Sequence, residues 1–262
     1  MLNTIVENRR KQVARNKELF PVKLLESSIY FDSDCVSLEQ YITREDKSGI
    51  IAEFKRKSPT KGIINQYADV LETTIAYMQA GASALSVLTE PDYFMGKDQD
   101  LKIARNVNYC PILRKDFIID EYQVIETKAI GADAILLIGA CLEKEALKNL
   151  YELARSLRLE VLFEINNIQE LNKLPGNNLM IGVNNRNLAT MKVDIQTSLD
   201  FADELSGDFV LISESGLSSA EDIIRLKKAG YSGFLMGEYF MKTPKPGETL
   251  KQLVANLQKL SE

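Results

Sequence analysis

From about residue 48 onward, short apolar segments alternate with longer amphipathic ones, and no other feature of the sequence constrains the fold as strongly. The apolar segments are nearly continuous runs of hydrophobic residues, as expected of parallel strands that helices cover on both faces. They predict eight strands, at residues 49–54, 84–89, 111–117, 134–139, 160–165, 180–185, 210–214 and 233–237.

The segments between the predicted strands carry the periodicity of helices. Apolar residues recur at helical spacing over residues 68–78 and again over residues 146–157. Gly81, Gly131 and Gly230 each lie between a predicted helix and a predicted strand, where a glycine suits the end of a helix. Their separations are close to multiples of roughly 50 residues, about two strand–helix units of a TIM barrel.

Eight strands joined by helices fit a closed barrel, because right-handed crossovers make this closure natural. An open doubly wound sheet is the alternative, but no Gly-x-Gly-x-x-Gly turn follows the first predicted strand. We therefore expect an α/β fold, a (β/α)8 TIM barrel with an N-terminal helical extension. The prediction is one domain over residues 1–262, with the extension at 1–47 and the barrel at 48–262.

The extension itself carries two weaker helical signals. Apolar positions 2, 5, 6 and 13 predict one short helix, and residues 37–41 predict another. The segment could close the bottom of the barrel or extend over its top and wall the active site, and the sequence does not decide between these. We expect the basic residues of the first helix to form a solvated face: Arg9, Arg10, Lys11 and Arg15.

The chain contains no histidine, which limits its possible chemistry. Acid–base catalysis must then depend on Lys, Glu, Asp, Tyr or Cys, and the commonest metal ligand is missing, so we expect no metal and no cofactor. The three cysteines form no C-x-x-C pair, which favours a reducing cytoplasm as the location. A net charge of −5 argues against nucleic acid as a partner, and the longest apolar run is too short to span a membrane.

Charged and polar residues gather at the predicted carboxyl ends of the strands, which is where active sites lie in TIM barrels. If the strand registers are as predicted, these side chains point into one mouth: Glu53, Lys55, Lys115, Glu164, Asn184 and Arg186. Such a cluster in a concave apolar site is costly unless the charges pair with one another or bind a ligand. The pattern therefore predicts an active site.

Five segments resemble, in order, the motifs of the indole-3-glycerol-phosphate synthase family. They are IAEFKRKSP at 51–59, LRKDFI at 113–118, IGVNNRNL at 181–188, SESG at 213–216 and FLMGE at 234–238. The first segment is highly specific, whereas the last two are shared by many phosphate-binding barrels. The resemblance covers essentially the whole chain, including the extension.

The resemblance implies a lyase of tryptophan biosynthesis that acts on 1-(o-carboxyphenylamino)-1-deoxyribulose 5-phosphate. The ring carbon that bears the carboxylate attacks the C2 carbonyl of the ribulose, and CO₂ and then water leave to give an indole. The expected partner is thus a small sugar phosphate, handled by a monomer or a weak homodimer.

The same resemblance implies the roles of individual residues. The catalytic set is Glu53, Lys55, Lys115, Glu164, Asn184 and Ser215. Lys115 is the candidate general acid for ring closure, while Glu164 and Lys55 share the dehydration in an order that stays open. Residues expected to contact the substrate are Ser58, Pro59, Phe94, Phe117, Leu136, Arg186, Leu188 and Glu214.

Phosphate has its own predicted site. The loops after strands seven and eight of such barrels commonly bind phosphate through backbone N–H groups, and glycine lets the backbone approach closely. The predicted phosphate ligands are Lys55, Ser215, Gly216, Gly237 and Glu238. The carboxylate of Glu238 must then turn away from the phosphate.

Three other functions are weighed against this one. A phosphoribosyl isomerase would use a Cys–Asp pair at strand ends, whereas Cys110 begins its predicted strand and is expected, like Cys141, to be a packing residue. A class I aldolase would use one lysine as a Schiff-base nucleophile. A catalytically inactive phosphate-binding barrel would bind the substrate without turnover.

Overall fold

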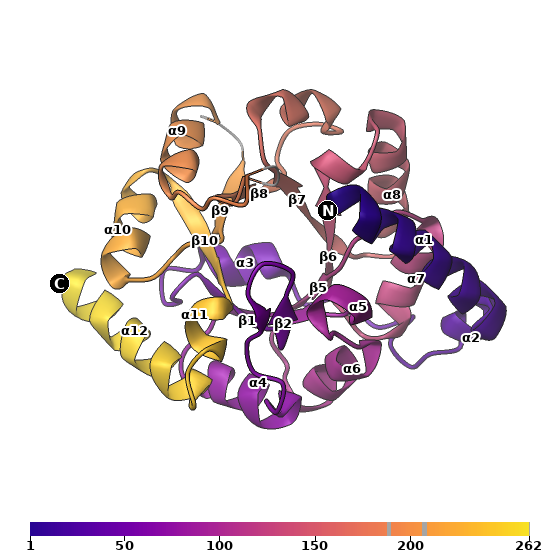
Figure 1. Ribbon diagram of the computed structural model, residues 1–262, viewed down its shortest axis with the longest axis horizontal. Helices are drawn as coiled ribbons and strands as arrows, with labels where there is room; N and C mark the ends of the chain where they lie inside the picture. Colours follow the sequence, from indigo (N-terminus) through magenta and orange to yellow (C-terminus); the bar gives the residue numbers. More distant parts are fainter. Residues whose placement is uncertain (188–189, 206–208, 262) are drawn as a thin grey trace.

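The computed structural model describes residues 1–187, 190–205 and 209–261 and contains a closed barrel of parallel strands (Figure 1). Around the barrel the order is β1-β10-β9-β8-β7-β6-β5-β4, so that the first strand closes on the last. The predicted TIM barrel is confirmed. Its eight strands are β1 (Ile50–Phe54), β4 (Ala84–Leu88), β5 (Ile112–Lys115), β6 (Ala134–Ile138), β7 (Glu160–Ile165), β8 (Met180–Asn184), β9 (Val210–Glu214) and β10 (Tyr231–Met236).

The observed strands match the predicted ones to within two residues at each end. The prediction carried β5 to residue 117, but the strand ends at Lys115, where the Asp116 carboxylate accepts the N–H of Phe117 at 2.8 Å. The last strand, β10, starts two residues before the predicted position. Its register shifts between Tyr231 and Gly233, an irregularity that interrupts the apolar pattern.

An outer layer of helices covers the barrel, as the amphipathic segments predict. Side-chain oxygens of Asp69, Asp120 and Ser219 accept backbone N–H groups at the starts of three of them. Between β7 and β8 a 3-10 helix, η2 (Ile168–Lys173), takes the place of an α-helix. The larger helices of the layer are α4 (Val70–Gln79), α6 (Asp98–Val107), α7 (Glu121–Ala129), α8 (Lys144–Ser156), α9 (Gln196–Glu204), α10 (Ala220–Lys228) and α12 (Pro246–Ser261).

Several short elements lie at the carboxyl ends of the strands. They are the hairpin strands β2 (Lys57–Ser58) and β3 (Gly62–Ile63), the helices α5 (Pro91–Phe94) and α11 (Glu238–Met241), and the 3-10 helix η1 (Gly139–Cys141). None of them was predicted, because strands of two residues and helices of one turn have no detectable periodicity.

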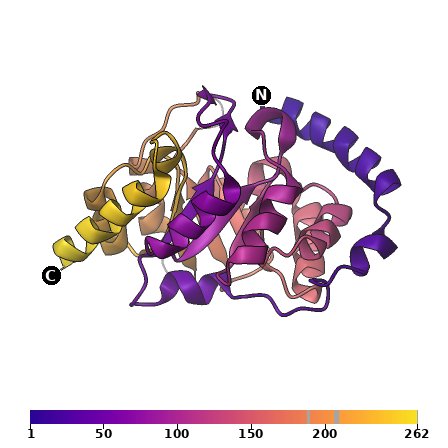
Figure 2. The ribbon, with the colours of Figure 1, turned by 90° about the horizontal axis from the view of Figure 1, so that it is seen from below.

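The N-terminal extension forms α1 (Leu2–Leu19), α2 (Val22–Glu26) and α3 (Leu38–Thr43). The extension takes both placements that the sequence left open, one at the bottom of the barrel and one at its top. Leu38 and Ile42 of α3 join the inner core at the amino ends of the strands, whereas the first turns of α1 reach the opposite end. Figure 2 shows α3 and the start of α1 at opposite ends of the barrel.

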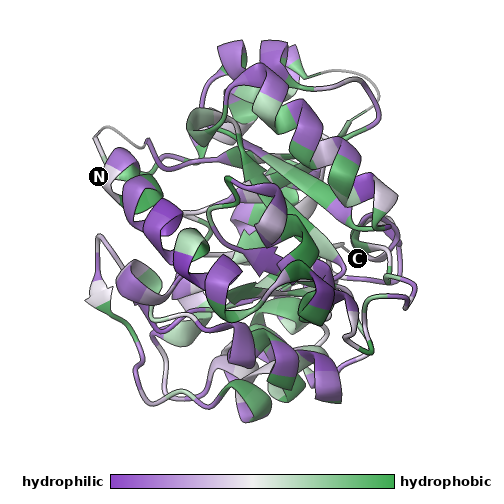
Figure 3. Cartoon of the chain, turned by 90° about the vertical axis from the view of Figure 1, so that its right-hand side faces the viewer, coloured by the Kyte–Doolittle hydropathy of each residue, from purple (hydrophilic) through white to green (hydrophobic). Residues whose placement is uncertain are grey.

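Two apolar layers build the core, one between the sheet and the helices and one inside the barrel. Figure 3 shows the strands as predominantly hydrophobic and the helices with hydrophilic residues interspersed. Leu136, Ile138 and Leu235 belong to the inner layer and also line the pocket above it, so the inner layer is the floor of that pocket. Within the described ranges, no helix has both the length and the apolar character needed to cross a membrane.

Candidate active site

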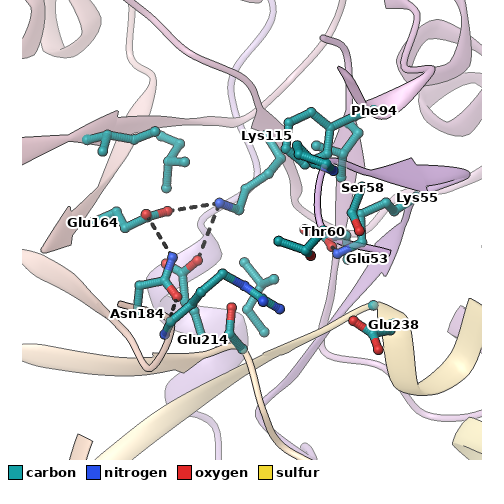
Figure 4. Close-up of a pocket in the computed structure, with 18 of the residues that line it drawn as sticks. Glu53, Lys55, Ser58, Thr60, Phe94, Lys115, Glu164, Asn184, Glu214 and Glu238 are labelled. Atoms are coloured by element: carbon teal, nitrogen blue, oxygen red, sulfur yellow. Dashed lines mark hydrogen bonds and ion pairs between the residues drawn. The ribbon is translucent and has the colours of Figure 1, made fainter. Parts of the chain in front are cut away.

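The pocket lies at the carboxyl ends of the strands, and every strand of the barrel contributes to its lining (Figure 4). Because the strands are parallel and closed into a ring, their ends are brought within reach of one another although they are far apart in sequence. The lining residues follow the strands in chain order. They are Glu53 of β1, Leu88 of β4, Lys115 of β5, Leu136 and Ile138 of β6, Glu164 of β7, Asn184 of β8, Glu214 of β9, and Leu235 and Met236 of β10.

Every predicted site residue that the structure describes lines this pocket, whereas Leu188 lies outside the described residues. The predicted residues found there are Glu53, Lys55, Ser58, Pro59, Phe94, Lys115, Phe117, Leu136, Glu164, Asn184, Arg186, Glu214, Ser215, Gly216, Gly237 and Glu238. The sequence interpretation missed further lining residues, namely Met1, Leu2, Ile5, Thr60, Leu88, Asp116, Ile138, Met191, Leu217, Leu235, Met236 and Tyr239. For Leu2 and Ile5 the signal was present as the apolar face of the first predicted helix.

Lys115 lies at the centre of the charged cluster. Its Nζ donates to Glu164 Oε2 at 2.9 Å and lies 3.4 Å from Glu214 Oε2. Asn184 donates from Nδ2 to the other oxygen of Glu164 at 2.9 Å, and its Oδ1 accepts the N–H of Arg186 at 2.9 Å. Since Asn184 is held at both ends of its carboxamide, it fixes the orientation of the Glu164 carboxylate.

The charges in the pocket shift two pKa values. Burial lowers the pKa of Lys115, but the charges of Glu164, Glu214 and Glu53 outweigh burial and hold that pKa above its ordinary value. The pKa of Glu214 is raised to about 8, with burial as the largest cause. The positive charge of Lys115 lowers this pKa, and the charges of Glu164 and Glu53 raise it. The pocket thus holds an ammonium that stays charged at neutral pH beside a carboxyl that keeps its proton.

Two glycines make room for buried carboxylates. A Cβ at Gly237 would lie 2.5 Å from Glu53 Oε1, and a Cβ at Gly182 would lie 2.1 Å from Glu214 Oε1. Glu53 is 3% exposed, and its Oε1 accepts from Lys55 Nζ at 2.5 Å. Any larger residue at either glycine would displace an acidic side chain of the pocket.

The segment after β1 folds into the β2–β3 hairpin. Its base is anchored by Arg56, whose guanidinium donates to both oxygens of Asp100 at 2.5 and 3.0 Å and lies over the ring of Phe54. Ser58 accepts the N–H of Lys61 at 3.2 Å within the hairpin. The hairpin carries Ser58, Pro59 and Thr60 to the edge of the pocket.

Phe94, Phe117 and Leu136 form an apolar wall of the pocket. Phe94 and Phe117 have ring centroids 6.1 Å apart with an angle of 41° between their planes. Phe94 ends α5, and the buried Glu90 caps this helix by accepting three backbone N–H groups. Rings this close contact each other, so a flat aromatic group would pack against the surface that they form with Leu136 and not between them.

Helix α1 is held against the pocket wall by a buried ion pair. Arg9 is 4% exposed, and its Nη2 lies 2.5 Å from Asp116 Oδ2. The prediction of a solvated face is therefore wrong for Arg9, while Arg10 is exposed as expected. The sequence could not indicate the pair, because Asp116 lies 107 positions further along the chain.

The turn after β9 has an unusual backbone. Ser215 and Gly216 both have positive φ values, 68° and 81°, and Gly216 packs so closely on Val193 that a Cβ would lie 2.4 Å from it. Left-handed conformations are unfavourable for serine, so neighbouring contacts must maintain this turn. Both residues line the pocket, and α11 follows β10, the strand next to β9.

The cysteines do not take part in this site. Cys110 is buried before the start of β5, at the amino end of the barrel, and burial raises its pKa to about 12. An inert thiol in that place is a packing residue, as predicted, and does not fit an isomerase that uses a strand-end cysteine. Among the described residues, no group of three or more His, Cys, Asp or Glu side chains is arranged to hold a metal ion.

Glu214→Gln is expected to change how stability depends on pH. In the folded state the pKa of Glu214 is about 8, above its ordinary value of 4.5. The folded protein therefore binds this proton more tightly than the unfolded chain does. The resulting contribution to the free energy of unfolding is complete below pH 4.5 and is lost as the pH rises through about 8. A glutamine does not titrate. The variant should therefore gain stability relative to the wild type between these pH values, by about 1 kcal/mol per pH unit. Urea unfolding across this range measures the difference, and a constant difference would contradict the raised pKa.

Comparisons with known proteins agree with the geometry. The family model described as Indole-3-glycerol phosphate synthase matches residues 2–253. A protein of that name from Bacteroides thetaiotaomicron is 46% identical over 258 residues, covering 98% of this chain and 99% of the relative. Another from Carboxydothermus hydrogenoformans is 41% identical over 263 residues, covering 97% and 99%.

Solved structures at low identity share the fold. The chain resembles thiamine phosphate pyrophosphorylase from Pyrococcus furiosus with a TM-score of 0.61 at 12% identity, covering 86% of this chain and 100% of that one. It resembles a mutant tryptophan synthase alpha-subunit from the same organism with a TM-score of 0.60 at 18% identity, covering 81% and 99%. At these identities the likeness concerns the barrel alone.

Proposed function

The chain belongs to the indole-3-glycerol phosphate synthase family, and from this premise we propose how its pocket performs the family's reaction. The chain is a carboxy-lyase of tryptophan biosynthesis. Its substrate, 1-(o-carboxyphenylamino)-1-deoxyribulose 5-phosphate, closes to indole-3-glycerol phosphate with loss of CO₂ and water. The observation that carries the mechanism is the contact of Lys115 with Glu164 inside the pocket.

In the proposed ring closure, Lys115 is the general acid. The ring carbon that bears the carboxylate attacks the C2 carbonyl, whose oxygen must gain a proton as the new bond forms. The Lys115 ammonium is held between two carboxyl groups, and its raised pKa keeps it protonated at neutral pH. An acid fixed in this way lowers the barrier to attack without solvent rearrangement.

In the proposed dehydration, the substrate nitrogen loses a proton and the hydroxyl group leaves as water. Glu164, a carboxylate oriented by Lys115 and Asn184, suits the removal of the proton. Lys55, an ammonium paired with Glu53, suits protonation of the leaving hydroxyl. We propose this one of the two orders that the sequence left open.

We assign the aromatic ring of the substrate to the apolar wall formed by Phe94, Phe117 and Leu136, with Arg186, Ser58 and Pro59 at its rim. The phosphate is assigned to the turn at Ser215 and Gly216 together with the backbone at Gly237 and Glu238, assisted by the Lys55 ammonium. The Glu238 carboxylate is 37% exposed and lies 3.8 Å from Lys61 Nζ. Such a partner draws the carboxylate toward the hairpin, as phosphate binding requires.

We further propose that residues 1–262 act as one domain and as a monomer or weak homodimer. Support for one domain comes from the pocket, whose described lining residues belong to both α1 and the barrel. The reduced cysteines and the biosynthetic relatives favour a cytoplasmic location.

The reaction can be followed directly by the fluorescence of the indole product, with EDTA present throughout. We expect rapid turnover of the carboxyphenylamino-deoxyribulose phosphate, because the proposed acid and base are side chains. Borohydride added with the substrate should trap no covalent adduct, which separates this lyase from a Schiff-base aldolase. A folded protein that binds the substrate without product formation would overturn the proposal in favour of an inactive phosphate-binding barrel, which the relatives do not favour.

A further inference from the structure

We propose that Asn185 is a positioning residue for phosphate binding, acting through the turn at Ser215 and Gly216. This inference rests on the proposed function, in which that turn binds the phosphate. Asn185 is 2% exposed and does not line the pocket, so it does not contact the substrate itself. Its influence must pass through the groups that its side chain holds.

The carboxamide of Asn185 joins three elements. Its Nδ2 donates to Ser213 Oγ in β9 and to the carbonyl oxygen of Ser215 in the turn, each at 3.0 Å. Its Oδ1 accepts from the backbone N–H and from the hydroxyl of Ser198 in α9, at 3.0 and 2.8 Å. Both donor positions and the acceptor are used, so the side chain has a single orientation.

The contact with Ser215 falls where the backbone needs support. A serine at a φ of 68° is in the left-handed region, which costs free energy unless the surroundings maintain it. A hydrogen bond on the Ser215 carbonyl fixes the peptide plane between Ser215 and Gly216. The direction of the Gly216 N–H, which faces the proposed phosphate, is set by that same peptide plane.

The network behind Asn185 is itself rigid. Ser198 and Ser213 are fully buried and their hydroxyl groups lie 2.8 Å apart, while Tyr231 donates to the Ser198 carbonyl at 2.7 Å. The carboxamide is thus a fixed link between helix α9 and the turn. The amide N–H of a rigid turn binds an anion without a further ordering cost.

Asn185→Asp tests the link with almost no change in shape. The carboxylate cannot donate, so an oxygen would face the Ser215 carbonyl and displace the turn. We expect the inhibition constant of inorganic phosphate and the KM for the substrate to rise by about 10- to 100-fold, the usual effect of losing one hydrogen bond to a charged group. The kcat should change less than threefold, because phosphate contacts are equally present in the ground and transition states.

Asn185→Ala is the second variant, since it removes the donor without placing a charge in the interior. We expect it to raise the inhibition constant of phosphate and the KM for the substrate as well, but by less than Asn185→Asp does. Asn108→Ala is the matched control, because it removes another buried carboxamide, which donates to Thr74 and to the Ala104 carbonyl away from the pocket lining. Thermal unfolding and circular dichroism establish that each variant is folded.

The inference is supported if both Asn185 variants weaken phosphate and substrate binding while Asn108→Ala does not. It is overturned if a folded Asn185→Ala matches the wild type, or if Asn108→Ala weakens binding equally. A wild type that turns over the substrate but is not competitively inhibited by phosphate would also overturn it. Absence of turnover in the wild type is a separate result, which would reject the proposed function.

Discussion

Lys115→Met is expected to lower kcat by about 10²- to 10⁴-fold, the usual contribution of a general acid. Methionine keeps much of the length and volume of the side chain but cannot protonate the carbonyl oxygen. It also removes the positive charge that lowers the pKa of Glu214, so that Glu214 should stay protonated to a higher pH. The measurement is product fluorescence at saturating substrate.

The matched control for this loss is Lys148→Met. Lys148 is a half-exposed lysine on α8, 3.8 Å from Glu152 and absent from the pocket lining. It should retain the wild-type kcat. If Lys115→Met remained fully active while folded, the family assignment would stand and Lys115 would have to be rejected as the acid.

Arg114→Met is expected to destabilise the fold by about 3 to 5 kcal/mol, as when one partner of a buried ion pair is removed. The Arg114 side chain is fully buried; its Nη2 donates to Glu126 at 2.7 Å and to Asp98 at 3.0 Å, and lies 3.3 Å from Asp116. The substitution leaves this group of acids without its central cation. For a chain of this size the melting temperature should fall by roughly 6 to 20 °C.

Thermal unfolding followed by circular dichroism measures this change. Arg44→Met serves as the control, because Arg44 pairs with Asp46 at the surface, where solvent screens the interaction. Arg114→Lys should fall between the wild type and Arg114→Met, since lysine keeps the charge but not the planar fork of donors. Equal melting temperatures for the Arg114→Met and Arg44→Met variants would show that the buried group does not support the fold.

The central part of the site was predictable from the sequence because it depends on strand ends. Once the apolar runs are assigned as parallel strands, the closed barrel alone brings Lys115, Glu164 and Asn184 together. Placing a single residue at the carboxyl end of a strand requires only the position of that strand in the sequence. The prediction of these site residues therefore depended on the alternating strands and helices, which are the most regular part of the chain.

Contacts between distant segments were not predictable in the same way. Arg9 looked like a solvated residue because its partner, Asp116, belongs to another element. The β2–β3 hairpin has strands of only two residues, too short for any periodicity. Nothing in the sequence indicates a role for Asn185, and only the packing of α9 behind it shows that its carboxamide holds the turn.

The closure of β1 on β10 also affects the order in which the protein can be made. Ile50 pairs with Phe234, and Glu53 shares one pocket with Gly237 and Glu238. During synthesis on the ribosome, the edge of β1 therefore stays unpaired until β10 has been made. The charged pocket cannot exist on a nascent chain, and a product truncated before β10 would expose unpaired strand edges at both ends of its sheet.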